Sequence, residues 1–443
     1  MTHGPELNVG IVSGEELRVN LATPYRLEGS NREPLEGDLT FRLSAAGRVE
    51  FEGKEYDGIE LRPAASGNGA RFEVKDVTIG VNFHWERKEN QSFTGGLGII
   101  VEDEPKRLTL VNRLPVEDYL KSVISSEMNA TSSPELLKAH AVISRSWLFA
   151  QLAAAKAPKC KDGWTDTAEE RIVWYDREDH KNFDVCADDH CQRYQGITRQ
   201  TRPEVEEAID ATFGVVLKDA EGKVCDARFS KCCGGVFEKF ESCWEPAPHP
   251  YLQALRDGEN ETDFPDLMDE DAAREWIAGS PEAYCNTRDE RVLAEVLNSY
   301  DRETPDFYRW NVEYSREELS DLLRRRAGED FGDVVEMKAL ERGTSGRIIR
   351  LLVRGTKKTK VIGKELEIRR SLSESHLYSS AFLAEGMDAD EHGVARRWRL
   401  RGAGWGHGVG LCQIGAAMMA HEGKSWEAIL GHYFPGAVLK KEY

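Results

Sequence analysis

Residues 114–147 read LPVEDYLKSVISSEMNATSSPELLKAHAVISRSW, and within this stretch the spacing of apolar residues changes from that of strands to that of helices. The pattern predicts one helix over 115–128 and a second over 132–156, which a serine and a proline open at the usual N-terminal positions. Before it, residues 5–112 show short alternating or apolar runs broken by Gly or Asn, as strands and turns do. The sequence therefore predicts an α+β protein with mixed, mostly antiparallel sheets and a buried helical pair.

Four consecutive regions follow from these patterns. They are a β-rich region over 1–112, the helices with a polar loop and further strands over 113–262, an α/β insertion lobe over 263–385, and a glycine-rich segment with a final helix over 386–443. In the later regions the patterns also predict shorter elements: strands over 214–230, 309–315, 346–355 and 360–370, and helices near 316–326 and over 425–434.

Composition limits the possible partners. The 443-residue chain has a formal net charge of −19, which argues against nucleic acid or an anionic membrane as its main partner, since both would require clustered Lys and Arg. No apolar run reaches about 18 residues, so no transmembrane segment is expected. The first residues lack the basic-then-apolar layout of a signal peptide, so the protein is either cytosolic or has lost a leader. Nine cysteines direct attention to metal or site chemistry.

Glu127 occupies an unusual position on the first predicted helix. At about 100° per residue, Leu120, Val123, Ile124 and Glu127 fall on one stripe. A carboxyl group among core residues would be desolvated, which favours its protonated form, and a general acid needs that form near neutral pH. The alternative is a glutamate near the helix end that simply reaches solvent.

The second predicted helix is apolar on most sides. One stripe holds Leu136, His140, Ile143 and Trp147, and another holds Ala141, Val142 and Phe149. Lys138 and Arg145 are seven residues apart and share the second stripe. Because buried cations need partners, three roles remain open for them: pairing with Glu127, gripping a substrate, or forming a plain structural ion pair.

The polar loop contains four possible metal ligands within twelve residues, namely His180, Cys186, His190 and Cys191. Two thiolates and two imidazoles suit tetrahedral zinc, although their spacing is not that of a zinc finger. Four protein ligands would close the coordination sphere and make the site structural. A Cys186–Cys191 disulfide and free thiols remain alternatives at this point.

Residues 401–416, RGAGWGHGVGLCQIGA, have glycine at every second position from 402 to 410. An extended segment of this kind would present one bare face and carry Trp405 and His407 on the other. The segment has neither a G-x-G-x-x-G register nor a following Gly-Lys-Ser/Thr, so a phosphate loop is excluded. Either the bare face admits a flat partner, or the glycines allow strands to pack tightly.

These stretches together resemble the SpoIID/LytB family, named for stage II sporulation protein D and the amidase enhancer. The resemblance is carried by residues 114–147, by YLQAL at 251–255, and by GWGHGVGLCQIGAAMMAHEGKSWEAILGHYFPGA at 404–437. It covers about 110–443. Asn129 departs from the usual Pro, and SKCCGG and GLCQ carry Cys where the family more usually has Ser.

The resemblance implies a SpoIID-like fold and a peptidoglycan lytic transglycosylase. Such an enzyme cuts glycan strands between N-acetylmuramic acid and N-acetylglucosamine, prefers peptide-stripped strands, and leaves 1,6-anhydro ends. By this resemblance the catalytic glutamate of the buried helical pair is Glu127, with Lys138 and Arg145 on the next helix. We expect the C-terminal segment to complete the cleft, and substrate contacts from Ser230, Trp405, His407 and Gln413.

The resemblance also bears on cofactor and location. Some family members bind zinc through His and Cys in the loop that corresponds to residues 180–191, so we expect a structural zinc ion on His180, Cys186, His190 and Cys191, and no organic cofactor. The expected partner is the peptidoglycan glycan strand, with a cell-wall amidase as a further candidate. Such partners indicate the cell envelope or another extracytoplasmic location.

Two other functions remain possible from the sequence. The first is a non-catalytic glycan-binding module that enhances a separate cell-wall amidase. The second is a cysteine hydrolase that uses Cys232, Cys233 or Cys412 with His407, although no local signature supports it. We prefer the transglycosylase because of the stripe position of Glu127.

Overall fold

The computed structural model describes residues 4–65, 69–79, 87–128, 132–155, 163–175, 180–188, 191–198, 202–297 and 306–443. The chain forms two compact units, each made of several segments. The first comprises Met1–Thr131, Arg177–Val215 and Lys441–Tyr443, and the second comprises Ser132–Asp176 and Val216–Lys440. The four consecutive regions expected from the sequence remain a prediction, because each of these units contains residues from more than one region.

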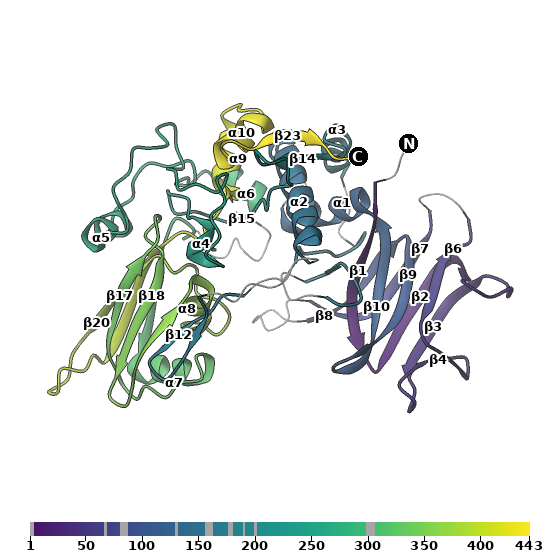
Figure 1. Ribbon diagram of the computed structural model, residues 1–443, viewed down its shortest axis with the longest axis horizontal. Helices are drawn as coiled ribbons and strands as arrows, with labels where there is room; N and C mark the ends of the chain where they lie inside the picture. The colour runs from purple at the N-terminus through teal and green to yellow at the C-terminus, as the bar shows by residue number, and fades with distance from the viewer. Residues whose placement is uncertain are drawn as a thin grey trace. The chain divides into compact units, whose positions relative to one another are not determined.

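The first unit is built on one sheet of eleven strands (Figure 1). Its main path runs β13-β1-β10-β9-β6-β2-β3-β4-β5, with β7 joined to β2 and β8. The strands are β1 (Glu6–Gly14), β2 (Glu16–Leu27), β3 (Leu35–Leu43), β4 (Val49–Phe51), β5 (Lys54–Tyr56), β6 (Ile59–Pro63), β7 (Arg71–Ile79), β8 (Arg87–Thr94), β9 (Gly96–Asp103), β10 (Lys106–Pro115) and β13 (Val185–Cys186). Among the described residues of this sheet, all ladders are antiparallel except the short β1–β13 pair.

Alternating apolar side chains give this sheet its buried face. In β2, Leu17, Val19 and Leu21 are buried while the residues between them are exposed or half-buried, as a strand with one covered face requires. The helices of this unit are α1 (Val116–Glu127) and α3 (Pro203–Ala211). The chain passes from β10 into α1 at Pro115, whose fixed φ suits a helix start.

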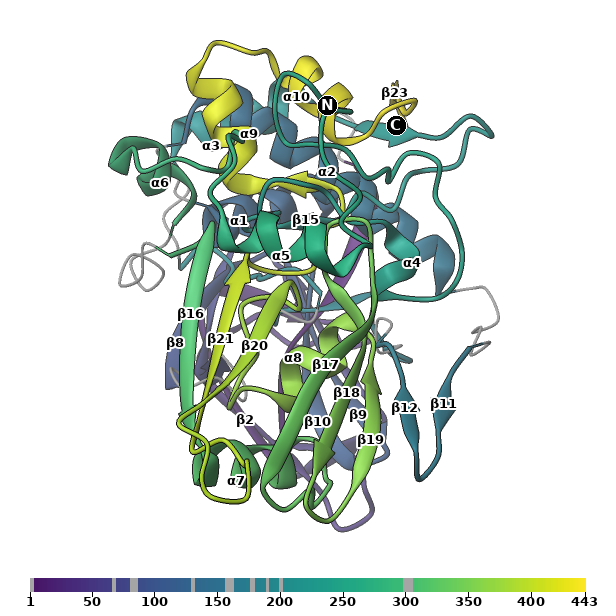
Figure 2. The ribbon, with the colours of Figure 1, turned by 90° about the vertical axis from the view of Figure 1, so that its left-hand side faces the viewer.

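The second unit contains two larger sheets and two short strand pairs (Figure 2). The five-stranded sheet has the order β11-β12-β19-β18-β17, and the three-stranded sheet has the order β16-β21-β20. Its strands are β11 (Thr165–Asp166), β12 (Glu170–Ile172), β15 (Phe229–Ser230), β16 (Arg309–Ser315), β17 (Val334–Arg342), β18 (Ile348–Gly355), β19 (Thr359–Gly363), β20 (Phe382–Met387), β21 (Arg397–Ala403) and β22 (Leu411–Cys412). One short pair is β15–β22, and the other is formed by β14 (Val215–Lys218) and β23 (Val438–Lys441). An apolar core that includes Trp310, Leu351 and Trp398 lies between the larger sheets and their helices.

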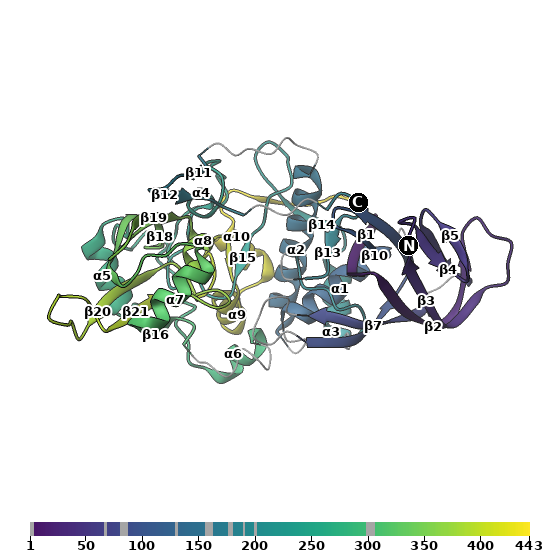
Figure 3. The same ribbon diagram turned by 90° about the horizontal axis from the view of Figure 1, so that it is seen from below.

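Helices cover these sheets and form a separate cluster. They are α2 (Pro134–Ala154), α4 (Phe240–Cys243), α5 (Glu270–Ala278), α6 (Glu290–Val296), α7 (Arg316–Arg326), α8 (Glu365–Ser371), α9 (Gln413–His421) and α10 (Trp426–Tyr433). Helix α7 lies against β16 and α8 against β19 (Figure 3), whereas α2, α9 and α10 pack on one another. Among the described residues, no helix is both long enough and apolar enough to span a membrane.

The structure confirms a mixed α/β protein with mostly antiparallel sheets, and it confirms the predicted helices around 115–128, 132–156, 316–326 and 425–434. One expectation is wrong. The sequence predicts a strand over 360–370, but β19 ends at Gly363 and α8 follows. Ile368 and Leu372 are both fully buried, and their i, i+4 spacing suits one face of a helix.

Candidate functional site

Glu127 is the last residue of α1 and is half-buried. The apolar part of its stripe is confirmed, because Leu120, Val123 and Ile124 are fully buried. The backbone N–H of Arg193 donates a hydrogen bond to Glu127 Oε1 at 3.1 Å. The carboxyl group therefore sits at the margin of the core, with its orientation set by a loop that is distant in sequence.

The loop of residues 192–195 is hydrogen-bonded to polar side chains of α1. The Tyr119 hydroxyl donates to Gln192 Oε1 at 3.4 Å, and the Gln195 N–H donates to Ser122 Oγ at 3.2 Å. The Tyr194 ring stacks on Tyr119 with centroids 5.2 Å apart. Burial raises the pKa of both tyrosines, so their hydroxyls remain donors at neutral pH. These contacts make α1 and the loop one rigid support for Glu127.

Sequence reasoning missed this support. Tyr119 and Ser122 are three residues apart on α1, so a polar stripe beside the apolar one was visible in the sequence. Its partners in the loop could not be identified, because 73 residues separate Tyr119 from Gln192 and Ser122 from Gln195.

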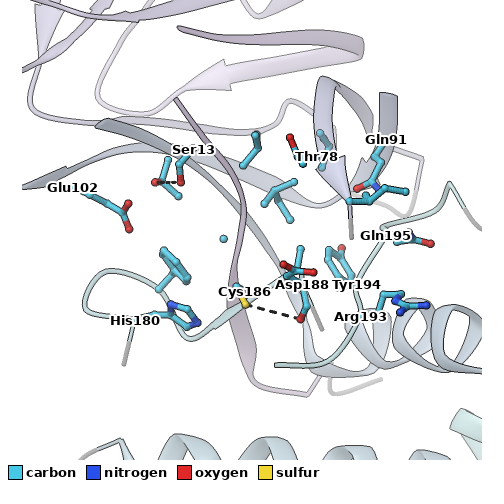
Figure 4. Close-up of a pocket in the computed structure, with 18 of the residues that line it drawn as sticks. Ser13, Thr78, Gln91, Glu102, His180, Cys186, Asp188, Arg193, Tyr194 and Gln195 are labelled. Carbon is cyan, nitrogen blue, oxygen red and sulfur yellow. Dashed lines mark hydrogen bonds between the residues drawn. The ribbon is translucent and has the colours of Figure 1, made fainter. Parts of the chain in front are cut away.

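The same loop lines a pocket of about 450 Å³ within the first unit (Figure 4). Arg193, Tyr194 and Gln195 form one wall, and strands β1, β7 and β10 contribute others. Gln91 also lines the pocket, and neither polar atom of its buried side-chain amide has a hydrogen-bond partner within the part of the chain that the structure describes. A buried amide of this kind is ready to bind a polar ligand group.

Three of the four predicted loop ligands come together beside this pocket. Potential ligand atoms of His180, Cys186 and Cys191 all lie within 4.8 Å of one another, with Cys191 Sγ 3.5 Å from His180 Nε2. His190, the fourth predicted ligand, lies outside the described residues. Both cysteines are thiols rather than halves of a disulfide.

The cysteines of the loop cluster and Glu127 act on the same side chain of α1, Tyr119. After burial, which is the larger cause, the charges of Cys191, Cys186 and Glu127 raise the pKa of Tyr119 further. The group His180, Cys186 and Cys191 therefore lies close to the helix that carries the glutamate.

Helix α2 carries the predicted Lys138 and Arg145, which differ in surroundings. Arg145 is fully buried. Lys138 is 26% exposed and pairs with Glu135, Nζ to Oε1 at 2.8 Å. Burial opposes ionisation of Glu135, but hydrogen bonds from Lys138 and from the Trp426 N–H hold its pKa below the usual value. The structural ion pair considered for Lys138 is thus present.

His140, on the same helix, joins α2 to the glycine-rich region. Its Nε2 lies 3.1 Å from Gln413 Nε2 and its Nδ1 lies 3.1 Å from Ser144 Oγ. The Gln413 amide donates to Nε2, so the ring is the Nδ1–H tautomer and donates to Ser144. Burial, aided by Lys231, lowers the pKa of His140 to about 3.

We expect His140 to make the folded state acid-sensitive. Its folded pKa of about 3 lies below the unfolded value of about 6.5, so its contribution is full above pH 6.5 and is lost as the pH falls. Because of this pKa difference, the free energy of unfolding should fall by about 2 kcal/mol when the pH is lowered from 7.5 to 5. Urea titrations at both pH values should show that His140→Asn removes this part of the loss. Equal losses in the wild type and the variant would contradict the assignment.

The glycine-rich segment differs from the expected extended strand. Strand β21 ends at Ala403, and Gly404, Gly406, Gly408 and Gly410 all have positive φ, between 71° and 93°. Their missing side chains face the protein itself: a Cβ at Gly410 would lie 2.2 Å from the Arg228 carbonyl oxygen. Of the two interpretations, tight packing of the chain on itself is the one the structure supports.

Gly410→Ala should therefore destabilise the second unit by about 3 kcal/mol, from left-handed strain and the clash with the Arg228 carbonyl. Gly431 is a matched control, because it lies inside helix α10 and a methyl group added there would meet nothing within 4 Å. Gly431→Ala should stabilise by about 0.5–1 kcal/mol. Thermal unfolding of both variants measures the difference, and equal midpoints would refute the steric argument.

The predicted substrate residues of the second unit are not equally available. Trp405 is half-buried and stacks on Phe307, with centroids 4.6 Å apart. Gln413 is buried and bound to His140. Ser230 is buried, and its hydroxyl has no hydrogen-bond partner among the described residues.

His407 is occupied by backbone contacts. Its Nδ1 accepts the Val409 N–H at 3.0 Å, and a further hydrogen bond joins the ring to the Phe229 backbone. Burial, reinforced by nearby arginines, holds the pKa of His407 well below its usual value. The ring is therefore neutral, and its hydrogen bonds to the backbone of Val409 and Phe229 give it a structural role.

A second group of possible metal ligands occurs in the second unit. Cys233, Asp257, Cys285 and Cys412 are buried, and one potential ligand atom from each lies within 4.8 Å of the others. This group can hold a metal ion. Sequence reasoning noticed two of these cysteines individually but did not bring the four residues together.

Comparison with known proteins agrees with the resemblance. The SpoIID family, described as stage II sporulation protein, matches residues 104–218, and a domain of unknown function, DUF8618, matches residues 238–410. Stage II sporulation protein D of Bacillus amyloliquefaciens is 26% identical over 75% of this chain and 76% of its own length, and that of Bacillus subtilis is 24% identical over 75% and 76%. The Bacillus subtilis amidase enhancer is 24% identical over 72% of this chain but only 40% of its own length. The chain is thus similar to the SpoIID family over residues 104–218, and distantly similar to proteins named stage II sporulation protein D and amidase enhancer over about three quarters of its length.

Proposed function

We propose that this protein is a peptidoglycan lytic transglycosylase with Glu127 as its general acid and base. Similarity to the SpoIID family supports a role in processing the cell wall. The observation that carries the proposal is the placement of Glu127: it ends a buried helix within the matched residues, and the Arg193 N–H orients its carboxyl group. A catalytic carboxyl group needs such fixed orientation.

The proposed reaction uses one carboxyl group twice. Protonated Glu127 donates its proton to the glycosidic oxygen as the bond to muramic C1 breaks. The resulting carboxylate takes the proton of the C6 hydroxyl while that oxygen attacks C1, which closes a 1,6-anhydro ring and restores the acid. Hydrolytic glycosidases usually need a second carboxylate to activate water or attack the sugar, and this route does not.

We assign supporting roles to the other predicted residues. Arg145 and Lys138 would hold acidic sugar groups, and Trp405 would offer an aromatic face to a sugar ring. The Ser230 hydroxyl, which has no hydrogen-bond partner among the described residues, would bind a sugar hydroxyl. His407 and Gln413 would shape the groove through the contacts already described rather than react.

The loop cluster would bind a structural zinc ion. His180, Cys186 and Cys191, with His190 as the proposed fourth ligand, match the nitrogen and sulfur ligands that zinc prefers. Such an ion would fix the loop whose Arg193 N–H holds Glu127, so its effect on catalysis would be indirect.

Cys186→Ser should therefore remove about one zinc per chain and reduce glycan cleavage by about 10–100-fold, although Glu127 is untouched. Cys225→Ser, at a buried thiol outside both clusters, is the control and should change neither quantity. Metal content by mass spectrometry and cleavage rate are measured on the same samples. Full activity in a zinc-free Cys186→Ser protein would remove the loop ion from the proposal.

Product analysis tests the reaction. Purified protein is incubated with peptide-free glycan strands, and the new ends are identified by mass spectrometry. A 1,6-anhydromuramic terminus supports the proposal, whereas a reducing terminus indicates hydrolysis and contradicts it.

The amidase enhancer among the relatives favours one alternative, a glycan-binding protein that stimulates a separate amidase. That function predicts glycan binding without new ends, and stimulation of an added amidase that Glu127→Gln does not affect. In either case we infer that the protein acts on the cell wall, outside the cytoplasm. The cysteine hydrolase is disfavoured, since Cys232, Cys233 and Cys412 are all buried.

A further inference from the structure

The second group of possible ligands comes from four separate segments of the second unit. Cys233 follows β15, Cys412 ends β22, and Asp257 and Cys285 lie in loops that precede and follow α5. Their exposures are 2%, 0%, 0% and 1%, in the order Cys233, Cys412, Asp257 and Cys285. Three thiols and a carboxyl group rarely gather in a core without a reason, because each loses hydration there.

The distances fit coordination of a single ion. Cys233 Sγ lies 3.5 Å from Cys285 Sγ and 3.4 Å from Asp257 Oδ2. Around tetrahedral zinc, with bonds of about 2.3 Å to sulfur and 2.1 Å to oxygen, ligand atoms are separated by about 3.8 Å for sulfur pairs and 3.6 Å for sulfur and oxygen. These two pairs would therefore need to separate by only a few tenths of an ångström to reach coordination geometry.

The surrounding hydrogen bonds suit thiolates and an oriented carboxylate. The Cys233 N–H donates to Cys412 Sγ at 3.2 Å, and the Gly235 N–H donates to Cys233 Sγ at 3.4 Å. The Tyr433 hydroxyl donates to Asp257 Oδ1 at 2.8 Å, while Oδ2 accepts the Cys285 N–H at 3.1 Å and lies 3.4 Å from Cys233 Sγ. Metal sites commonly have such a supporting shell around their ligands.

We propose that Cys233, Asp257, Cys285 and Cys412 bind one zinc ion as a buried structural site. Binding displaces the three thiol protons and forms three Zn–S bonds and one Zn–O bond, which closes the coordination sphere. The ion joins the strand pair β15–β22 to the loops around α5 and to the start of α9, where Gln413 lies. This site would explain why the stretches SKCCGG and GLCQ carry cysteine where the SpoIID/LytB family more usually has serine.

A disulfide between Cys233 and Cys285 is the competing explanation. Their sulfurs are 3.5 Å apart, whereas a disulfide bond measures about 2.05 Å. It would consume an oxidant and lower the chain mass by two hydrogens, so intact-mass measurement separates it from metal binding.

The test must separate this site from the loop cluster, so it uses full-length His180→Ala/Cys186→Ser protein, reduced and loaded with Zn²⁺. We expect about one zinc per chain in this background. Adding Cys285→Ser should lower the content to near zero, whereas adding Cys243→Ser, at another buried thiol, should leave it unchanged.

A second test loads the same double variant with Co²⁺. It keeps all four proposed ligands, so its result holds even if the Cys285→Ser variant fails to fold. We expect an intense sulfur-to-cobalt charge-transfer band with the visible bands of tetrahedral Co²⁺. No bound Zn²⁺ and no charge-transfer band in the reduced double variant would overturn the proposal, as would a stable Cys233–Cys285 disulfide. The outcome is independent of Glu127, so it stands or falls separately from the transglycosylase function.

Discussion

Glu127→Gln should abolish glycan cleavage without unfolding the protein. We expect the rate of 1,6-anhydro product formation to fall by about 10³-fold, near the middle of the range that general acid–base catalysis contributes. The amide keeps the shape of the side chain, and its oxygen can still accept the Arg193 N–H bond that Glu127 Oε1 accepts. Glutamine cannot donate a proton to the leaving oxygen or take one from the C6 hydroxyl, so both steps fail together.

Asp118→Asn is the matched control. Asp118 lies on the same helix, and its carboxylate pairs with Lys121 at 3.0 Å on a surface where both side chains are about a quarter to a third exposed. The same carboxylate-to-amide change there should leave the cleavage rate within about twofold, because exposed ion pairs contribute little. Both variants are assayed with peptide-free glycan after circular dichroism confirms equal folding.

Undiminished anhydro product from Glu127→Gln would remove Glu127 from the mechanism. A loss of cleavage with unchanged glycan binding would identify a chemical role. A variant that neither binds nor cleaves would point to a disturbed loop 192–195 and would contradict the role assigned here.

The helices were predictable because their signal is local and long. Helix α2 has 21 residues with a continuous 3.6-residue period, and a serine and proline at its start. Helix α8 has only seven residues, and its Leu366 and Ile368 alternate as in a strand. Over so short a segment the two periods cannot be separated, so the error at 365–371 has a physical origin.

The glycine-rich segment shows a different limit. Glycine at every second position is compatible with an extended chain, but also with a chain that turns repeatedly through the left-handed region. Which occurs depends on contacts such as Gly408 against the Arg347 guanidinium, 61 residues away in sequence. The sequence alone does not contain that contact.

The candidate sites follow the same rule. Glu127 could be found because its stripe neighbours lie within one helix. The buried ligand group could not, since Cys233 and Cys412 are 179 residues apart and no motif spacing joins them. The chemistry of each residue is readable from the sequence, whereas convergence of distant residues is a property of the fold.

Glu238→Ala should lower the free energy of unfolding by about 4 kcal/mol, a larger loss than that expected for Gly410→Ala. The Glu238 carboxylate is fully buried and accepts six hydrogen bonds. The donors are the Lys239 N–H, the Ser242 hydroxyl, and the N–H and hydroxyl groups of Thr344 and Ser345. Removing the carboxylate leaves buried backbone N–H groups without an acceptor, and it also leaves a cavity.

The network extends from Glu238 to the glycine-rich segment. Arg347 donates to the Ser345 hydroxyl at 2.9 Å and to the Gly406 carbonyl at 2.9 Å, while the Glu238 N–H donates to the Gly408 carbonyl at 2.9 Å. Loss of the carboxylate should therefore loosen the backbone on either side of His407 as well as lower stability. Chemical denaturation measures the loss of stability, and hydrogen exchange of residues 404–410 measures the loosening.

Two further variants make the Glu238 prediction specific. Glu238→Gln fills the same space but places an NH₂ group against a backbone N–H, so we expect an intermediate loss of about 2 kcal/mol. Glu221→Ala, at an exposed position, should change the unfolding free energy by less than about 0.5 kcal/mol. If Glu238→Ala cost no more than Glu221→Ala, the six hydrogen bonds would contribute nothing net. The glycine-rich segment would then have to be held by the Arg347 contacts and its own steric fit alone.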